Sequence, residues 1–231
     1  MVKTKGFRAG DSMTALAIVG AGGHGREVLL YSQGVHDYKF EDVFFLDDNE
    51  KLIGSYVCDA LVLGTIEGTV ERLDPEDTLF VCAVGSPYLR MAFVNRVLAV
   101  WGDRAKFANI VHSSIFLSKF VSLGVGSMVC PGTLVTTNVK IGNHVSVNLN
   151  CTLSHDVVIE DFVNLSPAVH LCGGSILREG CDIGAAVTVI PKVEIGEGAV
   201  VGAGACVISD IPPHSLAVGV PARIVRHNLN K

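Results

Sequence analysis

The feature of this sequence that most constrains its fold is an aliphatic residue at every sixth position from Val111 to Val207. At a background of roughly three Val, Leu or Ile residues in ten, so long an unbroken series has a chance probability on the order of one in a billion. A period of six fits neither an α-helix, at about 3.6 residues per turn, nor the alternation of an ordinary strand. It predicts a solenoid in which each hexad forms one short strand and one turn. The series is Val111, Leu117, Leu123, Val129, Val135, Ile141, Val147, Leu153, Ile159, Leu165, Leu171, Leu177, Ile183, Val189, Ile195, Val201, Val207.

The repeat also predicts how the coils stack. Three hexads would complete one triangular coil, so residues eighteen apart should lie directly above one another. The position four residues after each aliphatic is mostly small or β-branched, as at Val139, Cys151 and Val163, and should form a second inward site. Glycines recur at a further position of the hexad, where we expect tight corners. They are Gly124, Gly142, Gly184, Gly196, Gly202.

Composition narrows the protein class. A chain of 231 residues with 49% hydrophobic and 18% charged residues is typical of a soluble globular protein. The net charge of −5, without a Lys/Arg cluster, argues against nucleic-acid and anionic-membrane partners. No apolar run approaches the roughly 20 residues of a membrane span. Seven cysteines without a C-x-x-C pattern, two of them at inward positions (Cys151 and Cys181), indicate reduced structural cysteines and a cytoplasmic location.

The chain divides into four segments. Residues 1–12 have no apolar run with a cleavage site, and we interpret them as a disordered extension or cloning remnant rather than a signal peptide. Residues 13–105 alternate strand and helix patterns and predict a small α/β domain with a parallel sheet. Residues 106–211 form the solenoid. Residues 212–231 begin at a Pro-Pro pair that breaks the repeat, and should fold back to cap the last coil.

A glycine-rich turn follows the first predicted strand. The pattern Gly20-x-Gly22-x-x-Gly25 matches the dinucleotide fingerprint and opens a predicted helix. Its glycines would let the backbone approach a phosphate, which the free N–H groups of the helix start would bind. A domain of about 90 residues is half of a doubly wound fold, so a nucleotide diphosphate carried by a sugar fits better than a full dinucleotide. The alternative is a tight structural turn without a ligand.

Three polar residues accompany this turn. His24 lies inside it, where a ring nitrogen could meet a phosphate or a sugar hydroxyl. Asp47 and Asp48 end the next predicted strand, at the edge where such sheets bind ligands, and could accept hydrogen bonds from a base or a ribose. The alternative for the two aspartates is a solvated strand end.

Within the solenoid, His155 is the candidate general base. It lies at an outward position in Ser-His-Asp, and the eighteen-residue register stacks it over Gly173 and Asp156 over Gly174. Two glycines would leave a dip in the surface beside the imidazole. A histidine on the wall of a groove with a neighbouring carboxylate is suited to proton abstraction, although adjacent residues can cooperate only at a corner. The alternative is an ordinary surface histidine.

The remaining histidines carry a weaker signal. His144 and His170 are interpreted as surface or interface residues. The intervals between His112, His144, His155 and His170 contain no close pair such as H-x4-H, so we expect no metal site.

Taken together, several motifs resemble one family. They are GAGGHG at residues 20–25, FLDD at 45–48, AVGS at 83–86, the Ser-His-Asp triplet, and VGVPAR at 218–223. With the unbroken hexads, the chain resembles bacterial nucleotide-sugar acetyltransferases related to the bacillosamine and perosamine N-acetyltransferases and the sialic-acid O-acetyltransferases. The resemblance covers residues 13 to about 226. It implies a Rossmann-like nucleotide-sugar domain, a left-handed parallel β-helix, and a homotrimer with acetyl-CoA bound in clefts between neighbouring subunits.

The resemblance also implies residue roles. His155 matches the catalytic base and Asp156 the acidic residue that tunes it. Gly173 would lie at the cofactor, with a nearby main-chain N–H stabilising the oxyanion. Substrate contacts match Gly22, Gly23, His24, Asp47, Asp48, Gly85. Acetyl-CoA contacts match Asn164, Ala185, Ala203, with asparagine at 164 where a relative has histidine.

The resulting prediction is an acetyl-CoA-dependent N-acetyltransferase that acts on a UDP- or GDP-linked amino sugar by direct transfer, without a metal. A sugar O-acetyltransferase is the close alternative, because one base serves an amine or a hydroxyl equally. A metal-dependent lyase on the same solenoid and a non-catalytic nucleotide-sugar-binding scaffold are the others.

Overall fold

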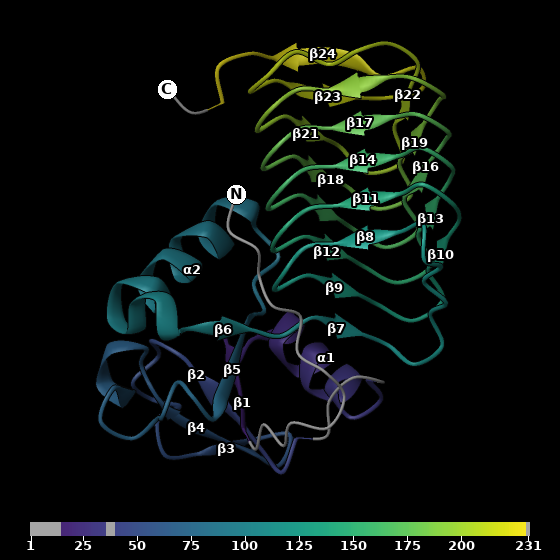
Figure 1. Ribbon diagram of the computed structural model, residues 1–231. Helices are drawn as coiled ribbons and strands as arrows, with labels where there is room; N and C mark the ends of the chain where they lie inside the picture. Colours follow the sequence, from purple (N-terminus) through teal and green to yellow (C-terminus); the bar gives the residue numbers. More distant parts are fainter. Residues whose placement is uncertain (1–14, 36–39, 230–231) are drawn as a thin grey trace.

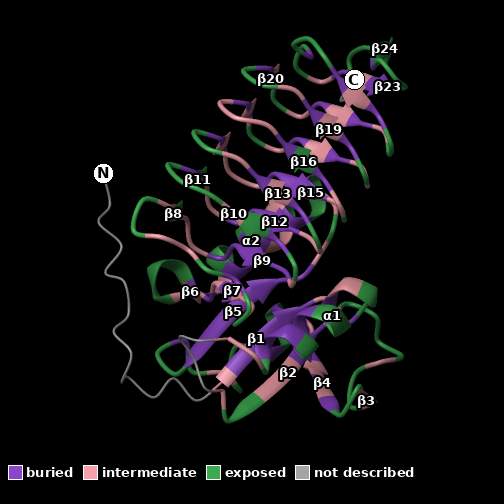
Figure 2. Cartoon of the chain, turned by 90° about the vertical axis from the view of Figure 1, so that its right-hand side faces the viewer, coloured by how far each residue is buried: buried purple, intermediate pink, exposed green. Residues whose placement is uncertain are grey.

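A computed structural model describes residues 15–35 and 40–229, so the extension expected at residues 1–12 lies outside the described residues. The chain has two parts: an α/β domain and a column of stacked three-sided coils (Figure 1). In both parts the buried residues form a continuous interior (Figure 2). The two predicted architectures, α/β first and solenoid second, are confirmed.

The α/β domain is built on a six-stranded sheet with the order β3-β4-β2-β1-β5-β6. All neighbouring strands are parallel except the β3–β4 hairpin. The strands are β1 (Ala15–Val19), β2 (Asp42–Leu46), β3 (Tyr56–Val57), β4 (Ala60–Gly64), β5 (Thr78–Cys82), β6 (Lys106–Phe107). The central strands β1 and β5 are almost wholly buried, as expected for parallel strands covered on both faces. The last strand, β6, lies just past the boundary expected at residue 105.

Two helices cover the faces of this sheet. Helix α1 (Gly23–Ser32) packs Val28 and Leu29 on one face, and α2 (Pro87–Trp101) packs Val94 and Val97 on the other. Short 3-10 turns, η1 (Glu67–Thr69) and η2 (Gly102–Arg104), complete the connections. Helix α2 begins at Pro87, because the Ser86 hydroxyl accepts a hydrogen bond from the Leu89 N–H at 3.4 Å and proline fits the first turn.

The second part is a three-sided parallel β-helix. Each strand has two residues, and the second residue of each is the sixth-position aliphatic. Pairing such as Ser146 with Asn164 and Thr152 with His170 confirms the eighteen-residue register. The aliphatics and the second inward position together fill one continuous core. The strands are β7 (Ile110–Val111), β8 (Ser122–Leu123), β9 (Met128–Val129), β10 (Leu134–Val135), β11 (Lys140–Ile141), β12 (Ser146–Val147), β13 (Thr152–Leu153), β14 (Val158–Ile159), β15 (Asn164–Leu165), β16 (His170–Leu171), β17 (Ile176–Leu177), β18 (Asp182–Ile183), β19 (Thr188–Val189), β20 (Glu194–Ile195), β21 (Val200–Val201), β22 (Cys206–Val207).

The corner prediction was wrong in its detail. Within the coils, positive φ occurs three positions after each aliphatic from Leu123 to Val201, as at Asn138, Asp156, Ala168 and Gly174. The recurrent glycines predicted for these corners serve a different purpose. A Cβ on Gly124 would lie within 2.5 Å of the Asn143 nitrogen in the next coil, so glycine there permits close stacking of the coils. Asparagine and aspartate tolerate the left-handed region, which lets polar side chains occupy the true corners.

The C-terminal segment extends one sheet of the column. Strand β23 (Leu216–Val218) continues the sheet beyond β21, and β24 (Arg223–Arg226) turns back antiparallel to it. The sheet that runs from β7 through β9, β12, β15, β18 and β21 to this cap faces the α/β domain, and we call it the domain-facing sheet. The outward side chains of Met128, Ser146 and Asn164 on this sheet are buried, because the α/β domain covers them.

Candidate functional site

The glycine turn at residues 20–25 contains two kinds of glycine: those that the turn itself requires, and those at which a side chain would meet open space. Gly20 has φ +101°, and a Cβ on Gly25 would collide with the Gly20 carbonyl oxygen, so both are required by the turn itself. A Cβ on Gly22 would meet no atom within 4 Å, and one on Gly23 would only reach Arg26 at 3.9 Å. These two positions therefore face open space at the start of α1, whose first turn holds no acidic residue to compete with a bound anion.

His24, in the first turn of α1, presents an unsatisfied nitrogen. Its Nδ1 lies 3.3 Å from Glu27 Oε2, while Nε2 is buried and has no hydrogen-bond partner. Burial lowers the pKa of His24, and the hydrogen bond to Glu27 only partly offsets this. The ring is thus held neutral, with one nitrogen available to a ligand.

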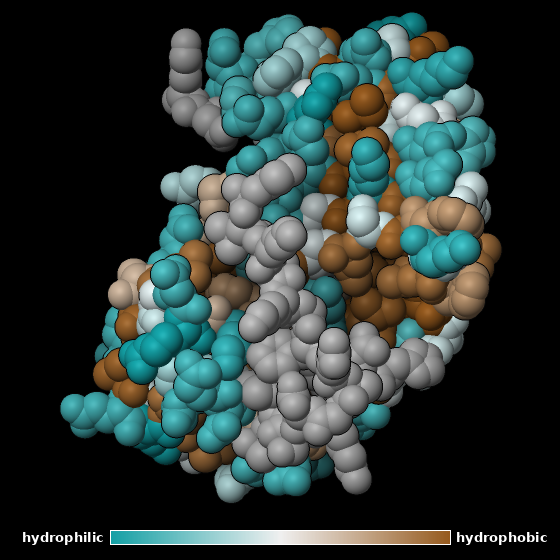
Figure 3. All heavy atoms as spheres, in the orientation of Figure 1, coloured by the Kyte–Doolittle hydropathy of each residue, from teal (hydrophilic) through white to brown (hydrophobic). Residues whose placement is uncertain are grey.

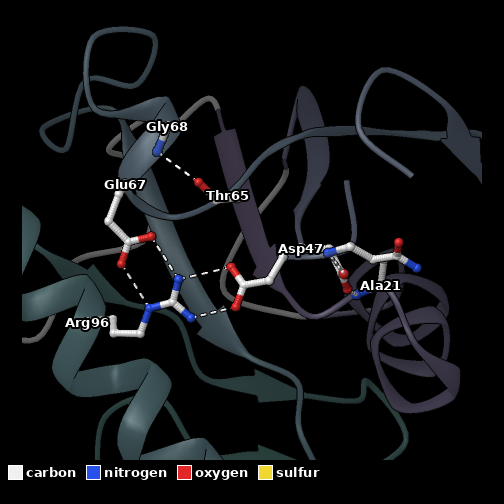
Figure 4. A network of polar contacts seen from close by, with 8 residues as sticks. Ala21, Asp47, Thr65, Glu67, Gly68 and Arg96 are labelled. Atoms are coloured by element: carbon white, nitrogen blue, oxygen red, sulfur yellow. Dashed lines mark hydrogen bonds and ion pairs between the residues drawn. The ribbon is translucent and has the colours of Figure 1, made fainter. Parts of the chain in front are cut away.

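Asp47, at the end of β2, holds the glycine turn in place. Its Oδ2 accepts a hydrogen bond from the Ala21 N–H at 2.7 Å, and its Oδ1 accepts one from the Asn49 N–H at 2.9 Å (Figure 4). One oxygen of this carboxylate therefore organises the backbone that would receive a phosphate. A direct contact between Asp47 and a base or ribose stays a prediction.

Asp48 is engaged by a partner that sequence analysis missed. Arg96 of α2 donates to both Asp48 oxygens, at 2.6 and 2.9 Å, and to both Glu67 oxygens, at 2.8 and 2.7 Å. The guanidinium thus joins the two carboxylates, and Figure 4 shows it beside Glu67. The Arg96 hydrogen bonds hold the pKa of Glu67 below its usual value. Asp48 is consequently fixed in orientation, and its predicted substrate contact is untested.

Gly85 lies in the turn between β5 and α2, which we call the substrate turn (residues 83–86). A Cβ on Gly85 would meet no atom within 4 Å, so its outer side is open. A cleft of about 310 Å³ begins beside this turn, between the start of α2 and the coils. Its polar lining includes Ser86, Tyr88, Asp182 and Glu197.

His155 lies at the corner between β13 and β14, on the outside of the coil. Its Nδ1 is 2.8 Å from Asp156 Oδ2, and the two side chains are 66% and 57% exposed. Adjacent side chains on a straight strand would point to opposite sides. Here Asp156 has a φ of +62°, which turns the backbone and brings its carboxylate beside the His155 ring. The hydrogen bond from His155 lowers the pKa of Asp156, followed by one from Asn138. With Nδ1 tied to a carboxylate, Nε2 is the nitrogen placed to take a proton.

Two neighbours shape this corner. Asn138, one coil earlier at the same corner position, donates from Nδ2 to Asp156 Oδ1 at 3.2 Å. Gly173, one coil later, lies against the imidazole: a Cβ there would be 2.5 Å from His155 Nε2. The prediction that His155 stacks over a glycine is confirmed, and the ring occupies space that any larger residue at 173 would fill. Asn138 was missed, although the eighteen-residue register could have found it.

The predicted cofactor residues lie on other parts of the same chain. Asn164 belongs to the domain-facing sheet, where its Nδ2 donates to Asp182 Oδ1 at 2.8 Å and it is 8% exposed. Ala185 and Ala203 stack at the corner that links this sheet to the one containing β13. His155 and Gly173 lie at the next corner around the coil. One chain therefore does not bring the two groups of predicted site residues together.

His144 is buried between the two parts of the molecule. Its ring stacks on Phe162 at 5.1 Å and meets Phe107 edge-on at 4.7 Å. Burial lowers its pKa to about 4, so the ring is neutral at pH 7. This location matches the interface alternative rather than the surface one.

Within residues 15–35 and 40–229, no three His, Cys, Asp or Glu side chains cluster as metal ligands. Over the same ranges, no helix is long and apolar enough to span a membrane.

These features define the class of hexapeptide-repeat acetyltransferases, and comparisons with known proteins support it. Residues 15–97 match the PglD N-terminal domain. Serine acetyltransferase of Salmonella typhimurium is 32% identical over 183 residues, which are 76% of this chain and 62% of that protein. A putative acetyltransferase of Staphylococcus aureus is 39% identical over 112 residues. The chain spans about half to two thirds of the length of these curated relatives.

Solved structures identify the family within this class. The acetyltransferase domain of PglB from Neisseria gonorrhoeae is 31% identical, with a TM-score of 0.83, over 91% of this chain and 99% of that one. The same domain has been solved in complex with acetyl coenzyme A. PerB from Caulobacter crescentus, in complex with CoA and GDP-perosamine, is 28% identical with a TM-score of 0.82, over 92% and 97%. The chain belongs to the nucleotide-sugar acetyltransferase family.

Proposed function

We propose that the protein transfers an acetyl group from acetyl-CoA to the amine of a nucleotide-linked amino sugar, with His155 as general base. The observation that carries this proposal is the His155–Asp156 pair, exposed at a coil corner and packed against Gly173. The family relatives supply the substrate class, since one binds acetyl coenzyme A and another binds CoA together with GDP-perosamine.

The chemistry requires one base and no covalent enzyme intermediate. The sugar nitrogen attacks the thioester carbonyl while His155 Nε2 takes a proton from that nitrogen. Asp156 accepts the Nδ1 hydrogen bond and stabilises the imidazolium that forms. The tetrahedral intermediate then collapses, the carbon–sulfur bond breaks, and the CoA thiolate leaves. A main-chain N–H near Gly173 would stabilise the oxyanion, and holding both substrates together supplies much of the remaining rate enhancement.

The nucleotide sugar would bind at the open side of the glycine turn. Gly22 and Gly23 would admit a diphosphate to the start of α1, and the unsatisfied Nε2 of His24 would accept a hydrogen bond from a hydroxyl of the ligand, because Nδ1 donates to Glu27. Gly85 would contact the same ligand, because the substrate turn follows β5, the neighbour of β1 in the sheet. Asp47 and Asp48 would contact the base or ribose with the carboxylate edges that their internal hydrogen bonds leave open. The sheet order β4-β2-β1-β5-β6 supports a Rossmann-like domain for this purpose.

The active site would form between subunits of a homotrimer. Within one chain helix α1, which begins at the glycine turn, contacts β7 of the domain-facing sheet, whereas His155 and Gly173 lie at the corner between the other two sheets. A neighbouring copy could supply the missing half, with Asn164, Ala185 and Ala203 lining acetyl-CoA. Hydrophobic side chains on the outside of the coils support such contacts (Figure 3), since Phe116, Phe120 and Leu134 are 79%, 58% and 66% exposed. A left-handed β-helix and a cytoplasmic location complete this proposal.

The test is a screen of UDP- and GDP-linked amino sugars with acetyl-CoA, which follows the release of free thiol and identifies the product by mass spectrometry. The proposal predicts thiol release with at least one amino sugar and an N-acetylated product. O-acetylated product would identify the hydroxyl-directed alternative. Binding of a nucleotide sugar in a thermal-shift assay without any CoA binding would indicate a scaffold. A reaction that starts only after a divalent metal is added would contradict the metal-free mechanism.

A further inference from the structure

Arg90 is the most deeply buried charged side chain of the described residues. It lies on α2 and is 0% exposed, on the stripe formed by Pro87, Val94, Val97 and Trp101 that faces the interior. All five of its hydrogen bonds go to main-chain carbonyl oxygens, and none goes to a carboxylate.

The five acceptors come from two distant regions of the chain. Two lie in the substrate turn: Nη1 donates to the carbonyls of Val84 at 2.7 Å and Gly85 at 3.2 Å. The other three lie on two stacked coils. Nε donates to the carbonyl of His144 at 2.8 Å, and Nη2 donates to the carbonyls of Phe162 at 2.7 Å and Val163 at 3.0 Å. One rigid guanidinium thus joins the turn that borders the proposed substrate to the β-helix.

Stability alone does not account for this arginine. Burial lowers the pKa of Arg90 to about 10, so it remains charged at pH 7 and bears the cost of losing water. An apolar residue could fill the same stripe of α2 without that cost. What a planar guanidinium adds is a fixed geometry for five acceptors, which neither an apolar side chain nor lysine reproduces.

We propose that Arg90 is a positioning residue that sets the substrate turn at a fixed place against the coils, and so aligns the acceptor sugar with the base. This inference rests on the proposed function. The packed coils of the trimer would carry acetyl-CoA and the His155 of a neighbouring subunit, whereas the α/β domain, which Arg90 fixes to its own coils, would carry the nucleotide sugar. A displacement of about 1 Å between two reacting groups can reduce turnover by about a hundredfold.

The experiment compares Arg90→Met and Arg90→Lys with the matched control Arg178→Met. Arg178 makes three hydrogen bonds to Glu160 and Glu194 across successive coils and none to the α/β domain. Steady-state kinetics are measured by thiol release. The concentration of acetyl-CoA and that of the nucleotide amino sugar that the protein turns over are varied separately. Hydrogen exchange by mass spectrometry follows the peptides that contain residues 83–91 and 142–146.

We expect Arg90→Met to lower kcat/KM for the amino sugar by about tenfold to a hundredfold, while KM for acetyl-CoA stays within about twofold. Arg90→Lys retains the charge and most of the volume, and it should lose kcat/KM for the amino sugar in the same way. It replaces Arg90→Met in the comparison if the methionine variant does not fold. In both Arg90 variants, hydrogen exchange should accelerate in the peptides that contain residues 83–91 and 142–146. Arg178→Met should change none of these quantities, although its melting temperature can fall.

Two results would overturn the inference. One is a kcat/KM for the amino sugar that stays at the wild-type value, or a KM for acetyl-CoA that rises by more than about twofold, in a folded Arg90 variant. The other is unchanged exchange in the residue 83–91 peptide. If wild-type protein turns over no amino sugar, the proposed function fails, whereas the exchange measurement still decides whether Arg90 fixes the substrate turn.

Discussion

Two adjacent glycines at the His155 corner permit a test that separates catalysis from folding. Gly173 has no positive φ, so alanine fits its backbone, but the added Cβ would lie 2.5 Å from His155 Nε2. The ring must therefore move, and it can do so because it is an exposed side chain. Gly174 has φ +70°, and its added Cβ would make only an ordinary 3.5 Å contact with Lys192 Cγ. The first variant displaces the base, and the second strains only the backbone.

Gly173→Ala should reduce turnover but not stability, whereas Gly174→Ala should reduce stability but not turnover. General-base catalysis contributes about 10² to 10⁴ in rate, so Gly173→Ala should lower kcat by about a hundredfold, with a melting temperature within about 2 °C of wild type. Alanine in the left-handed region costs about 1–2 kcal/mol. At about 2–4 °C per kcal/mol, Gly174→Ala should lower the melting temperature by roughly 2–8 °C and keep kcat within about threefold. Alanine is tolerated at this corner position, since Ala168 has φ +60°.

The assay combines thiol release from acetyl-CoA at saturating substrates with differential scanning fluorimetry on the same preparations. The reasoning is refuted if Gly173→Ala retains kcat within about twofold of wild type. It is also refuted if Gly174→Ala loses more activity than Gly173→Ala does.

Three further predictions follow from individual side chains. Asp156→Asn should lower kcat by about tenfold or more, because the imidazolium that forms on His155 during transfer loses its carboxylate partner; an unchanged kcat would contradict this. Asn138→Ala should lower kcat by about threefold. The control is Asn143→Ala, which breaks the same kind of contact with an aspartate one coil later but at a different corner from His155, and it should lower the melting temperature and leave kcat unchanged. His144 has a folded pKa of about 4, below its unfolded value of about 6.5, so the unfolded state binds the extra proton and stability is lost as pH falls from about 6.5 towards 4. This pKa difference contributes at most about 3 kcal/mol to the free energy of unfolding. In urea unfolding at pH 7.5 and 5, the free energy of unfolding of His144→Gln should depend less on pH than that of wild type. An equal dependence would contradict this prediction.

The solenoid could be predicted from sequence because its physical cause is local and periodic. A coil interior accepts only apolar side chains, so each hexad carries the same signal, and the register fixes which residues stack. The contact between His155 and Gly173 follows directly from that register. The same rule applied to Asn138 and Asp156 would have found the third member of this group, because they too are eighteen residues apart.

The corners were harder to predict, because two different constraints favour glycine. Close stacking of coils excludes a Cβ at positions such as Gly124, whereas positive φ occurs two residues later and admits Asn, Asp, His or Ala. The recurrence of glycine at one position of the hexad revealed only the first constraint, close stacking of the coils.

Long-range polar contacts left the weakest signals. The pairing of Arg96 with Asp48 joins residues 48 apart through a tertiary arrangement that no local pattern specifies. Arg90 did leave a signal, since it falls on the buried stripe of α2 between Pro87 and Val94, where a charged residue is costly without a specific partner. Its carbonyl partners, however, belong to coils more than fifty residues away.

The most direct test of the account is the turnover of His155→Ala with acetyl-CoA and the nucleotide amino sugar that wild-type protein acetylates. If His155 is the base, kcat should fall by about 10² to 10⁴ while acetyl-CoA still binds with unchanged affinity. Turnover that stays within about tenfold of wild type would contradict the assignment of this imidazole as the base.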